Sequence, residues 1–341
     1  MDEIEAFQEA HPSTASYWRS IVLFGRNTAT YKFALAESLL EAASRGKDTL
    51  SLSELAVPYA SHMCEHLERR PRQATNPSST FLTTCVEYNS GAIDQGTLVD
   101  HTAKTGFRYV LDAFHKVNGR DVPDRFFEKT KTGIILTDEA FRLLESPQAA
   151  SLALETEARW DLVETAWNIG VPTSALAIEY DSTASNLYVE PTPVRRVNIA
   201  KTRDALNGYQ KGKCFYCFDD ISIDPSSEDL CDVDHFFPFA LGKYMLDVPI
   251  NGVWNLVLAN KRCNRGEDGK FDRIPALEYL ERLSRRNEFL ISSHHPLRET
   301  IMRQTGFTPQ ARRRFLQRTY NRARDLIGYQ WKTEAVGPEA F

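Results

Sequence analysis

The spacing of apolar and polar residues predicts a mainly helical first part of the chain. Apolar residues recur at helical intervals, and alanine and glutamate support the same structure. A stretch rich in proline, serine and asparagine at 69–79 predicts a loop. We therefore expect a mainly helical domain over residues 1–192. The helices expected in it cover about 14–45, 52–67, 97–117 and 150–168.

Shorter β-prone runs and a change of pattern follow this helical part. A strand is expected at 133–137, and two further runs lie at 175–180 and 187–190. The prolines and arginines of 191–196 indicate a domain boundary. A helix at about 197–210 and then a β-hairpin and a helical start are expected next.

The remaining pattern completes an α+β fold with three parts. Residues 193–272 are expected to form the second domain, which contains the β-hairpin. Basic helices with loops around 291–297 and 305–310 are predicted for the rest of the chain. Residues 273–341 would therefore be a helical extension that packs on the second domain or continues it.

Composition and length place the chain among ordinary globular proteins. It has 341 residues, of which 42% are hydrophobic and 26% charged, enough for about two domains. No apolar run approaches the ~18 residues that a membrane span needs, so no membrane partner is expected. The acidic start lacks the pattern of a signal peptide. We therefore expect a cytoplasmic protein.

The charge is unevenly distributed. The net charge is −5 over the whole chain, yet 261–332 holds 17 Lys and Arg against 8 Asp and Glu. Within it, Arg314, Arg318 and Arg322 recur every four residues and would line one helix face. A basic face of this kind either binds a nucleic-acid backbone or is a solvated surface. The charge alone leaves both interpretations open.

Four short motifs lie close together between residues 214 and 270. Cys214 and Cys217 form a Cys-x-x-Cys pair with the spacing of zinc knuckles. An Asp-Val-Asp-His run, a Trp-Asn-Leu-Val-Leu run and a Cys-Asn-Arg-Gly run then follow in that order. The chemically important positions in these three runs are Asp234, His235, Asn255, Cys263 and Asn264.

In this order and spacing, the motifs resemble the HNH endonuclease family in its Asp-His-Asn-Asn variant. The resemblance implies a ββα-metal, treble-clef-like nuclease domain that hydrolyses DNA, expected to be double-stranded. It implies that His235 is the general base and that Asp234 and Asn264 are ligands of Mg²⁺ or Mn²⁺. It also implies that Asn255 orders the loop and orients the base. These four residues are the expected catalytic set.

The chemistry of these residue types agrees with that resemblance. Histidine titrates near neutral pH, so His235 can take a proton from water. A carboxylate and an amide oxygen make an incomplete oxygen shell, as Mg²⁺ prefers when it also binds substrate phosphate. The basic residues near the helical start, which would hold DNA phosphates, are Arg262, Arg265 and Lys270.

A structural zinc site is also expected. Four of the six cysteines fall between residues 214 and 263, and in a reducing compartment such clustering points to metal. The resemblance places Cys214, Cys217 and Cys263 at ligand positions, but Asn260 stands where the family has a fourth ligand. Zinc favours cysteine, histidine and carboxylate. Either Cys231 or Asn260 completes the site, another residue does so, or the site is empty.

Two rival functions remain open at this stage. One is a non-catalytic zinc-knuckle protein that binds DNA or acts as an adaptor. The other is a metallopeptidase built on His62, Glu65 and His66, which match the pattern His-x-x-Glu-His on one helix face. The helical domain over 1–192 would be a sensor, a surface that docks a protein partner or a reader of target specificity. By analogy alone, a nuclease with such a domain suggests bacterial restriction or anti-phage defence.

Overall fold

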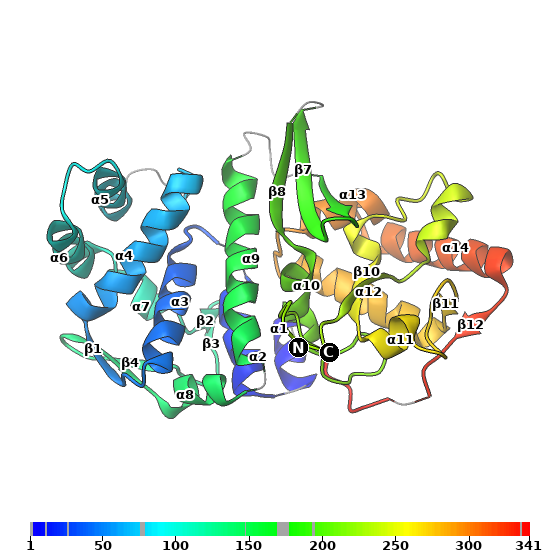
Figure 1. Cartoon of the computed structure of the whole chain (residues 1–341), viewed down its shortest axis with the longest axis horizontal. Coiled ribbons are helices and arrows are strands. Elements are labelled where there is room, and N and C mark those ends of the chain that lie inside the picture. Colours follow the sequence, from blue (N-terminus) through cyan, green and yellow to red (C-terminus); the bar gives the residue numbers. More distant parts are fainter. Residues whose placement is uncertain are drawn as a thin grey trace. The chain divides into compact units, whose positions relative to one another are not determined.

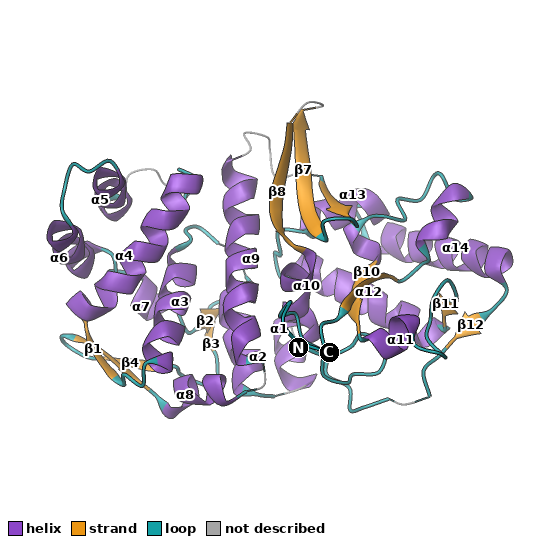
Figure 2. Ribbon diagram, viewed as in Figure 1, coloured by secondary structure: helices purple, strands orange, loops and turns teal. Residues whose placement is uncertain are grey.

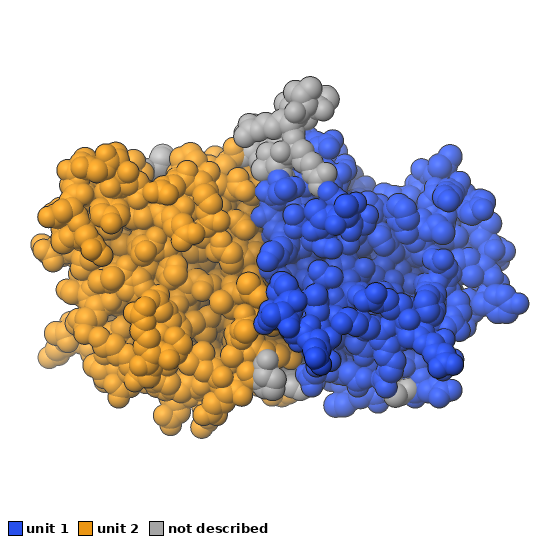
Figure 3. Space-filling view, viewed as in Figure 1, with its two compact units in different colours: residues 1–11, 171–341 blue, residues 12–170 orange. Residues whose placement is uncertain are grey.

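The structure is a computed structural model that describes most of the chain in two compact units. The described residues are 3–10, 12–25, 27–75, 79–146, 148–168, 177–192, 195–334 and 336–341. One unit spans 12–170, and the other combines 1–11 with 171–341 (Figure 3). Both helices and small sheets are present, which confirms the predicted α+β class. In the described part, no helix has the length and apolarity to cross a membrane.

Helices dominate the unit 12–170 (Figure 2). Its helices are α2 (Thr14–Leu23), α3 (Tyr31–Ser44), α4 (Leu52–Arg69), α5 (Thr80–Asn89), α6 (Gln95–Thr105), α7 (Val110–Ala113), α8 (Asp138–Glu145) and α9 (Ala149–Asn168) (Figure 1). The predicted helices at 52–67 and 150–168 are confirmed as α4 and α9. Ser51 begins α4 with a capping box, in which its side chain and that of Glu54 bond each other's backbone.

Two predicted helices of this unit are interrupted. The expected helix at 14–45 is broken between α2 and α3, where Gly25 has φ = 83° and so cannot continue a helix. The expected helix at 97–117 ends early, and its last two residues pair in a hairpin of β2 (Lys116–Val117) with β3 (Arg120–Asp121). Tertiary and turn structure therefore override a continuous helical pattern at both places.

A three-stranded antiparallel sheet completes the same unit. Its order is β1 (Thr49–Ser51), β5 (Gly133–Leu136) and β4 (Phe127–Lys129), and β5 confirms the strand predicted at 133–137. Gly133 is required there, because a Cβ would lie 1.9 Å from the Leu50 carbonyl oxygen. The largest fully buried side chains of the unit include those of Trp18, Phe33, Tyr59, Phe126 and Trp160.

The other unit begins with α1 (Glu3–Ala10) and resumes with an antiparallel sheet. The strand order is β6 (Ile178–Asp181), β7 (Asn186–Thr192) and β8 (Arg195–Lys201). Residues 175 and 176 of the predicted run lie outside the described residues. The predicted helix at 197–210 is wrong at its start, because 197–201 pair with β7 and α10 covers only Thr202–Gln210. The domain boundary predicted near residue 192 falls within this unit.

The motif region forms a strand, a strand and a short helix in that order. β9 (Asp232–His235) pairs antiparallel with β10 (Leu256–Ala259). α11 (Lys261–Arg265) follows β10 (Figure 1). Two 3₁₀ turns, η2 (Phe239–Lys243) and η3 (Val253–Asn255), lie in the connection between the strands. The basic helices predicted beyond are confirmed as α12 (Leu277–Ser292), α13 (Arg298–Thr305) and α14 (Pro309–Ile327). A short parallel pair, β11 (Ile274–Pro275) and β12 (Gln330–Trp331), flanks them.

Candidate functional site

The register of the β9–β10 pair determines which motif residues share a face. His235 lies opposite Leu256 and Asp234 opposite Val257. Because side chains alternate along a strand, Asp232 and Asp234 face one side and His235 faces the other. The predicted base and the carboxylate before it therefore point in different directions.

His235 is half-buried at the end of β9 and has a defined hydrogen-bond partner. Its Nε2 lies 2.9 Å from Oδ1 of Asn251, whose Nδ2 in turn donates to the Tyr180 carbonyl oxygen at 3.0 Å. This orientation of the amide makes Nε2 the protonated nitrogen and leaves Nδ1 as a proton acceptor. Burial lowers the pKa of His235, although the hydrogen bond to Asn251 opposes the shift. The imidazole is therefore neutral at neutral pH, as a general base requires.

Asp234 is enclosed by two buried side chains. The Tyr216 hydroxyl donates to its Oδ2 at 2.6 Å, and Lys270 Nζ lies 3.1 Å from its Oδ1. Burial raises the pKa of Asp234, while Lys270 and Tyr216 oppose that shift. Lys270, which was expected to contact DNA phosphate, is only 1% exposed. The structure thus places Lys270 inside its unit, as the partner of Asp234, and not at the surface.

Asn264 contacts Asp232 and not Asp234, with which it was expected to bind one metal ion. Its Nδ2 donates to Oδ2 of Asp232 at 3.0 Å, and Arg265 Nε lies 2.9 Å from the same oxygen. No hydrogen bond or ion pair between Asn264 and Asp234 is found in the described part of the chain. Asp232 was not among the predicted site residues, although the two-residue period of a strand puts Asp232 and Asp234 on one face.

Asn255 ties together the two ends of the connection between the strands. It is fully buried, its Oδ1 accepts from the Phe237 backbone N–H at 2.8 Å, and its Nδ2 donates to the Phe237 carbonyl at 2.9 Å and to the Ile250 carbonyl at 2.8 Å. All of its amide hydrogen-bonding groups are thus directed at backbone. This is the loop-ordering position that the resemblance implies for Asn255.

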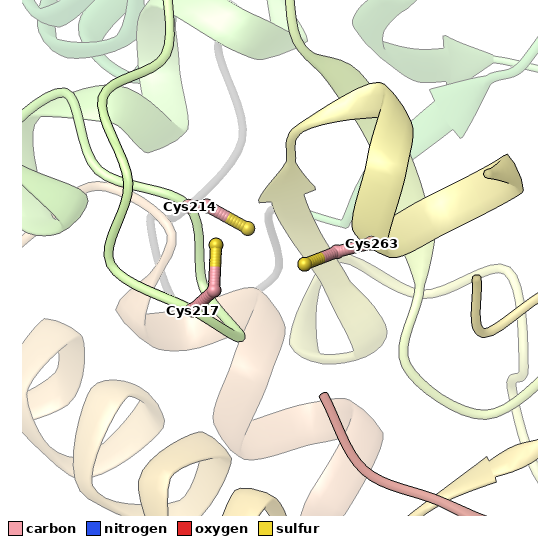
Figure 4. Close-up of side chains that lie close together, drawn as sticks. All are labelled: Cys214, Cys217 and Cys263. Carbon is pink, nitrogen blue, oxygen red and sulfur yellow. The ribbon is translucent and has the colours of Figure 1, made fainter. Parts of the chain in front are cut away.

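Three cysteine side chains lie close together, two in the turn after α10 and one in α11. The sulfur atoms of Cys214, Cys217 and Cys263 lie within 4.8 Å of one another, and all three residues are buried. Figure 4 shows the three sulfurs directed at one another, two from the turn after α10 and one from α11. Hydrogen bonds from the other two thiols hold the pKa of Cys217 well below its usual range. This group could hold a metal ion such as zinc.

Neither Asn260 nor Cys231, the two residues considered as a fourth ligand, belongs to the three-cysteine group. Asn260 caps α11, because its Oδ1 accepts from Cys263 N at 2.7 Å. Its Nδ2 donates to Cys217 Sγ at 3.2 Å and its backbone N to Cys214 Sγ at 3.4 Å. Asn260 therefore stabilises the sulfurs by donating hydrogen bonds. Cys231 is buried but lies outside the three-cysteine group.

The arginines predicted to bind phosphate lie at the surface. Arg262 pairs with Asp219 at 2.7 Å, while Arg265 pairs with Asp232. The predicted stripe on α14 is exposed at all three positions, Arg314, Arg318 and Arg322. Arg322 donates to both carboxylate oxygens of Asp247 at 2.8 Å. α14 therefore has a basic surface, although Arg322, the last arginine of the stripe, already has an acidic partner.

The His-x-x-Glu-His motif on α4 does not converge on one point. His66 is buried and groups with Glu157 and Asp161 of α9, whereas His62 pairs with Glu41 at 3.5 Å.

No protein-family model, curated protein or solved structure matches this chain. Function therefore has to be inferred from the geometry and chemistry of the site itself.

Proposed function

We propose that this chain is a metal-dependent endonuclease of the HNH type that hydrolyses phosphodiester bonds in DNA. The observation that supports this most is His235, a neutral imidazole at the end of β9 whose Nε2 donates to Asn251. Nδ1 is then the nitrogen able to accept a proton. Asn255, which ties the loop after His235 to the backbone, keeps this arrangement rigid.

In the proposed reaction, His235 Nδ1 removes a proton from a water molecule. The oxygen of that water attacks phosphorus, and the bond from phosphorus to the leaving sugar oxygen breaks. A bound Mg²⁺ or Mn²⁺ would supply charge neutralisation on the phosphate and on the leaving oxygen. Asn255 contributes by holding the loop after His235, so that the imidazole is already in position before the reaction begins.

The proposed ligand set for that ion includes one more carboxylate than the resemblance implies. The resemblance assigns the ion to Asp234 and Asn264. We add Asp232, because its carboxylate is 17% exposed and lies beside Asn264. For the two to bind an ion together, Asn264 would turn its amide oxygen toward the ion and Arg265 would leave the Asp232 carboxylate. Asp234 would join them only after Lys270 or Tyr216 moves, since those groups occupy its oxygens. The oxygen-rich character of the set fits Mg²⁺ or Mn²⁺.

The same proposal gives roles to the neighbouring groups. A zinc ion on Cys214, Cys217 and Cys263 would fix the turn after α10 against α11. Surface arginines would hold duplex DNA by its phosphates, which positions the substrate without reading its sequence. The arginines proposed for this are Arg262, Arg265, Arg314, Arg318 and Arg322.

A non-catalytic DNA-binding protein is the alternative, and two observations favour it. His235 faces the other side of β9 from Asp232 and Asp234, so the proposed base and the proposed ion do not share a face in this arrangement. Asp234 is closed off by Tyr216 and Lys270, so the set implied by the resemblance is not open to an ion in this arrangement. Such a protein would bind duplex DNA with similar strength in Mg²⁺ and in EDTA and would never cut it.

A plasmid-nicking experiment separates these proposals. Wild-type protein with Mg²⁺ is expected to relax or linearise supercoiled DNA, and EDTA should abolish this. Asp232→Asn should slow cleavage at least about a hundred-fold, because a removed charge stabiliser of this kind costs that much. Asp220→Asn is the matched control, because Asp220 is exposed and pairs only with Lys213 in the ion pairs found. Binding without any cutting would instead support the non-catalytic alternative.

A further inference from the structure

A second group of possible metal ligands lies in the helical unit, far in sequence from the proposed nuclease site. His66 on α4 and Glu157 and Asp161 on α9 place one ligand atom each within 4.8 Å of one another. The site is enclosed on the histidine side and open on the other: the side chain of His66 is 3% exposed and that of Glu157 is 40% exposed. An ion could therefore enter from solvent past the carboxylates.

The surroundings of His66 fix its orientation. Its Nδ1 lies 2.9 Å from Oε2 of Glu164, which is fully buried and also accepts from Gln73 Nε2 at 2.6 Å. Trp160 stacks on the imidazole with 3.5 Å between ring centroids, and its Nε1 donates to Gln73 Oε1 at 2.9 Å. A carboxylate on one histidine nitrogen, with the other nitrogen directed at further ligands, is the usual arrangement around a metal-binding histidine.

The spacing of the ligand atoms suits a divalent ion. His66 Nε2 lies 3.0 Å from Oε2 of Glu157. Two ligands at right angles around an ion, each about 2.1 Å from it, are about 3.0 Å apart. The nitrogen and the carboxylate oxygen could therefore bind one ion with little movement of either side chain.

An unpartnered carboxylate oxygen provides a second, independent observation. Oε1 of Glu37, on the neighbouring α3, is buried and has no hydrogen-bond partner in the described structure. Glu37 interacts electrostatically with both Glu157 and His66. Arg69 pairs with Glu157 and Arg70 with Glu164, but neither pairs with the free oxygen of Glu37 in the ion pairs found among the described residues. A bound cation would supply the partner that this oxygen lacks.

We propose that His66 Nε2 and the carboxylates of Glu157 and Asp161 bind a divalent metal ion, with Glu37 as an additional carboxylate at the same site. One imidazole and several carboxylates are a ligand set typical of Mn²⁺ and Zn²⁺. The site is separate from the nuclease proposal and does not depend on it.

Arg69 competes with an ion for this place. Its Nη2 lies 3.2 Å from His66 Nε2 and 3.1 Å from Glu157 Oε1. The Arg69 side chain is 44% exposed, so it can swing into solvent when an ion arrives. Removing the guanidinium should therefore strengthen ion binding, whereas a purely structural ion-pair network would only lose a contact.

The test measures Mn²⁺ binding to the full chain by electron paramagnetic resonance of the free ion. We expect Asp161→Asn to bind one Mn²⁺ fewer per chain than wild type. Asn has nearly the same shape and removes a crowded charge, so the metal-free variant should unfold at the same temperature as wild type or higher. Arg69→Gln should bind about tenfold tighter, and Glu68→Gln, an exposed residue of α4 outside the ligand group, should bind as wild type does.

Two results would overturn the proposal. The first is equal Mn²⁺ stoichiometry in wild type and in a folded Asp161→Asn variant. The second is Mn²⁺ affinity that is unchanged or weaker in Arg69→Gln, because the arginine would then belong to a structural network. Mn²⁺ at the proposed nuclease site is present in all of these proteins, so its gain or loss cannot produce either difference.

Discussion

The two clusters of possible metal ligands in this chain differ in almost every physical respect. The cysteine group offers three sulfurs, is buried throughout and is sealed further by N–H groups of Asn260. The His66 group offers a nitrogen and carboxylate oxygens, is open on one side and adjoins a buried oxygen of Glu37 that has no hydrogen-bond partner in the described structure. Soft, enclosed ligands suit a permanent structural ion, and hard, open ligands suit an ion that exchanges. We therefore expect the two sites to differ in how strongly folding depends on them.

The largest effect should come from the cysteine group. Structural zinc contributes on the order of 10 kcal/mol to the folding of small sites. Cys263→Ser should therefore abolish zinc binding and the cooperative unfolding of the unit that contains α10 to α14. The matched control is Cys231→Ala, a buried cysteine outside the group, which should cost only about 1 kcal/mol. Elemental analysis measures the bound zinc and calorimetry the unfolding of each variant. If Cys263→Ser and Cys231→Ala lose the same amount of stability, the three-cysteine group is not a structural metal site.

A smaller loss is expected at the buried ion pair. Lys270→Met leaves Asp234 buried without its cation, which should lower the free energy of unfolding by about 3–5 kcal/mol. Lys213→Met is the control, because its partner Asp220 is exposed and such a pair contributes less than about 1 kcal/mol. Denaturant titration compares the two variants. If the loss from Lys270→Met is as small as that of the control, Asp234 does not need a charged partner.

These two sites also show what the sequence can predict. The cysteine group was predictable because Cys214 and Cys217 sit in one turn with zinc-knuckle spacing. The partners of Asp234 were not, because Tyr216 and Lys270 reach it only once the hairpin and the following loop have folded. Strand alternation could have identified Asp232 as the neighbour of Asn264.

The His66 group could not have been predicted from local patterns. The motif on α4 suggested that His62 and His66 act together, since they lie four residues apart. The actual neighbours of His66 come from α9, about ninety residues later, and depend on how α4 and α9 are brought together. Long regular helices such as α4 and α9 were predicted well. The break after α2 and the strand β8 were missed, because turn geometry and strand pairing override helical patterns there.

The smallest effect is expected on the basic surface of α14. Replacing Arg314, Arg318 and Arg322 with Gln should reduce the salt dependence of DNA binding by up to about three units in the log–log slope. The reduction should be nearer two units if Arg322 stays with Asp247 in the complex. The slope comes from binding curves at several salt concentrations. An unchanged slope would mean that this surface does not meet phosphate.

The most direct test of the nuclease proposal is the single-turnover rate of plasmid cleavage by two variants. Each variant changes one partner of the hydrogen bond between His235 and Asn251. His235→Ala should fold and bind DNA like wild type but cleave about 10²–10⁴-fold more slowly, the usual contribution of a general base. Asn251→Ala removes the partner that holds the proton on Nε2, together with the bond from Asn251 to the Tyr180 carbonyl. It should slow cleavage less than His235→Ala does, because the imidazole itself remains. Cleavage by His235→Ala at the wild-type rate in Mg²⁺ would contradict the assignment of His235 as the base, and with it the proposed mechanism.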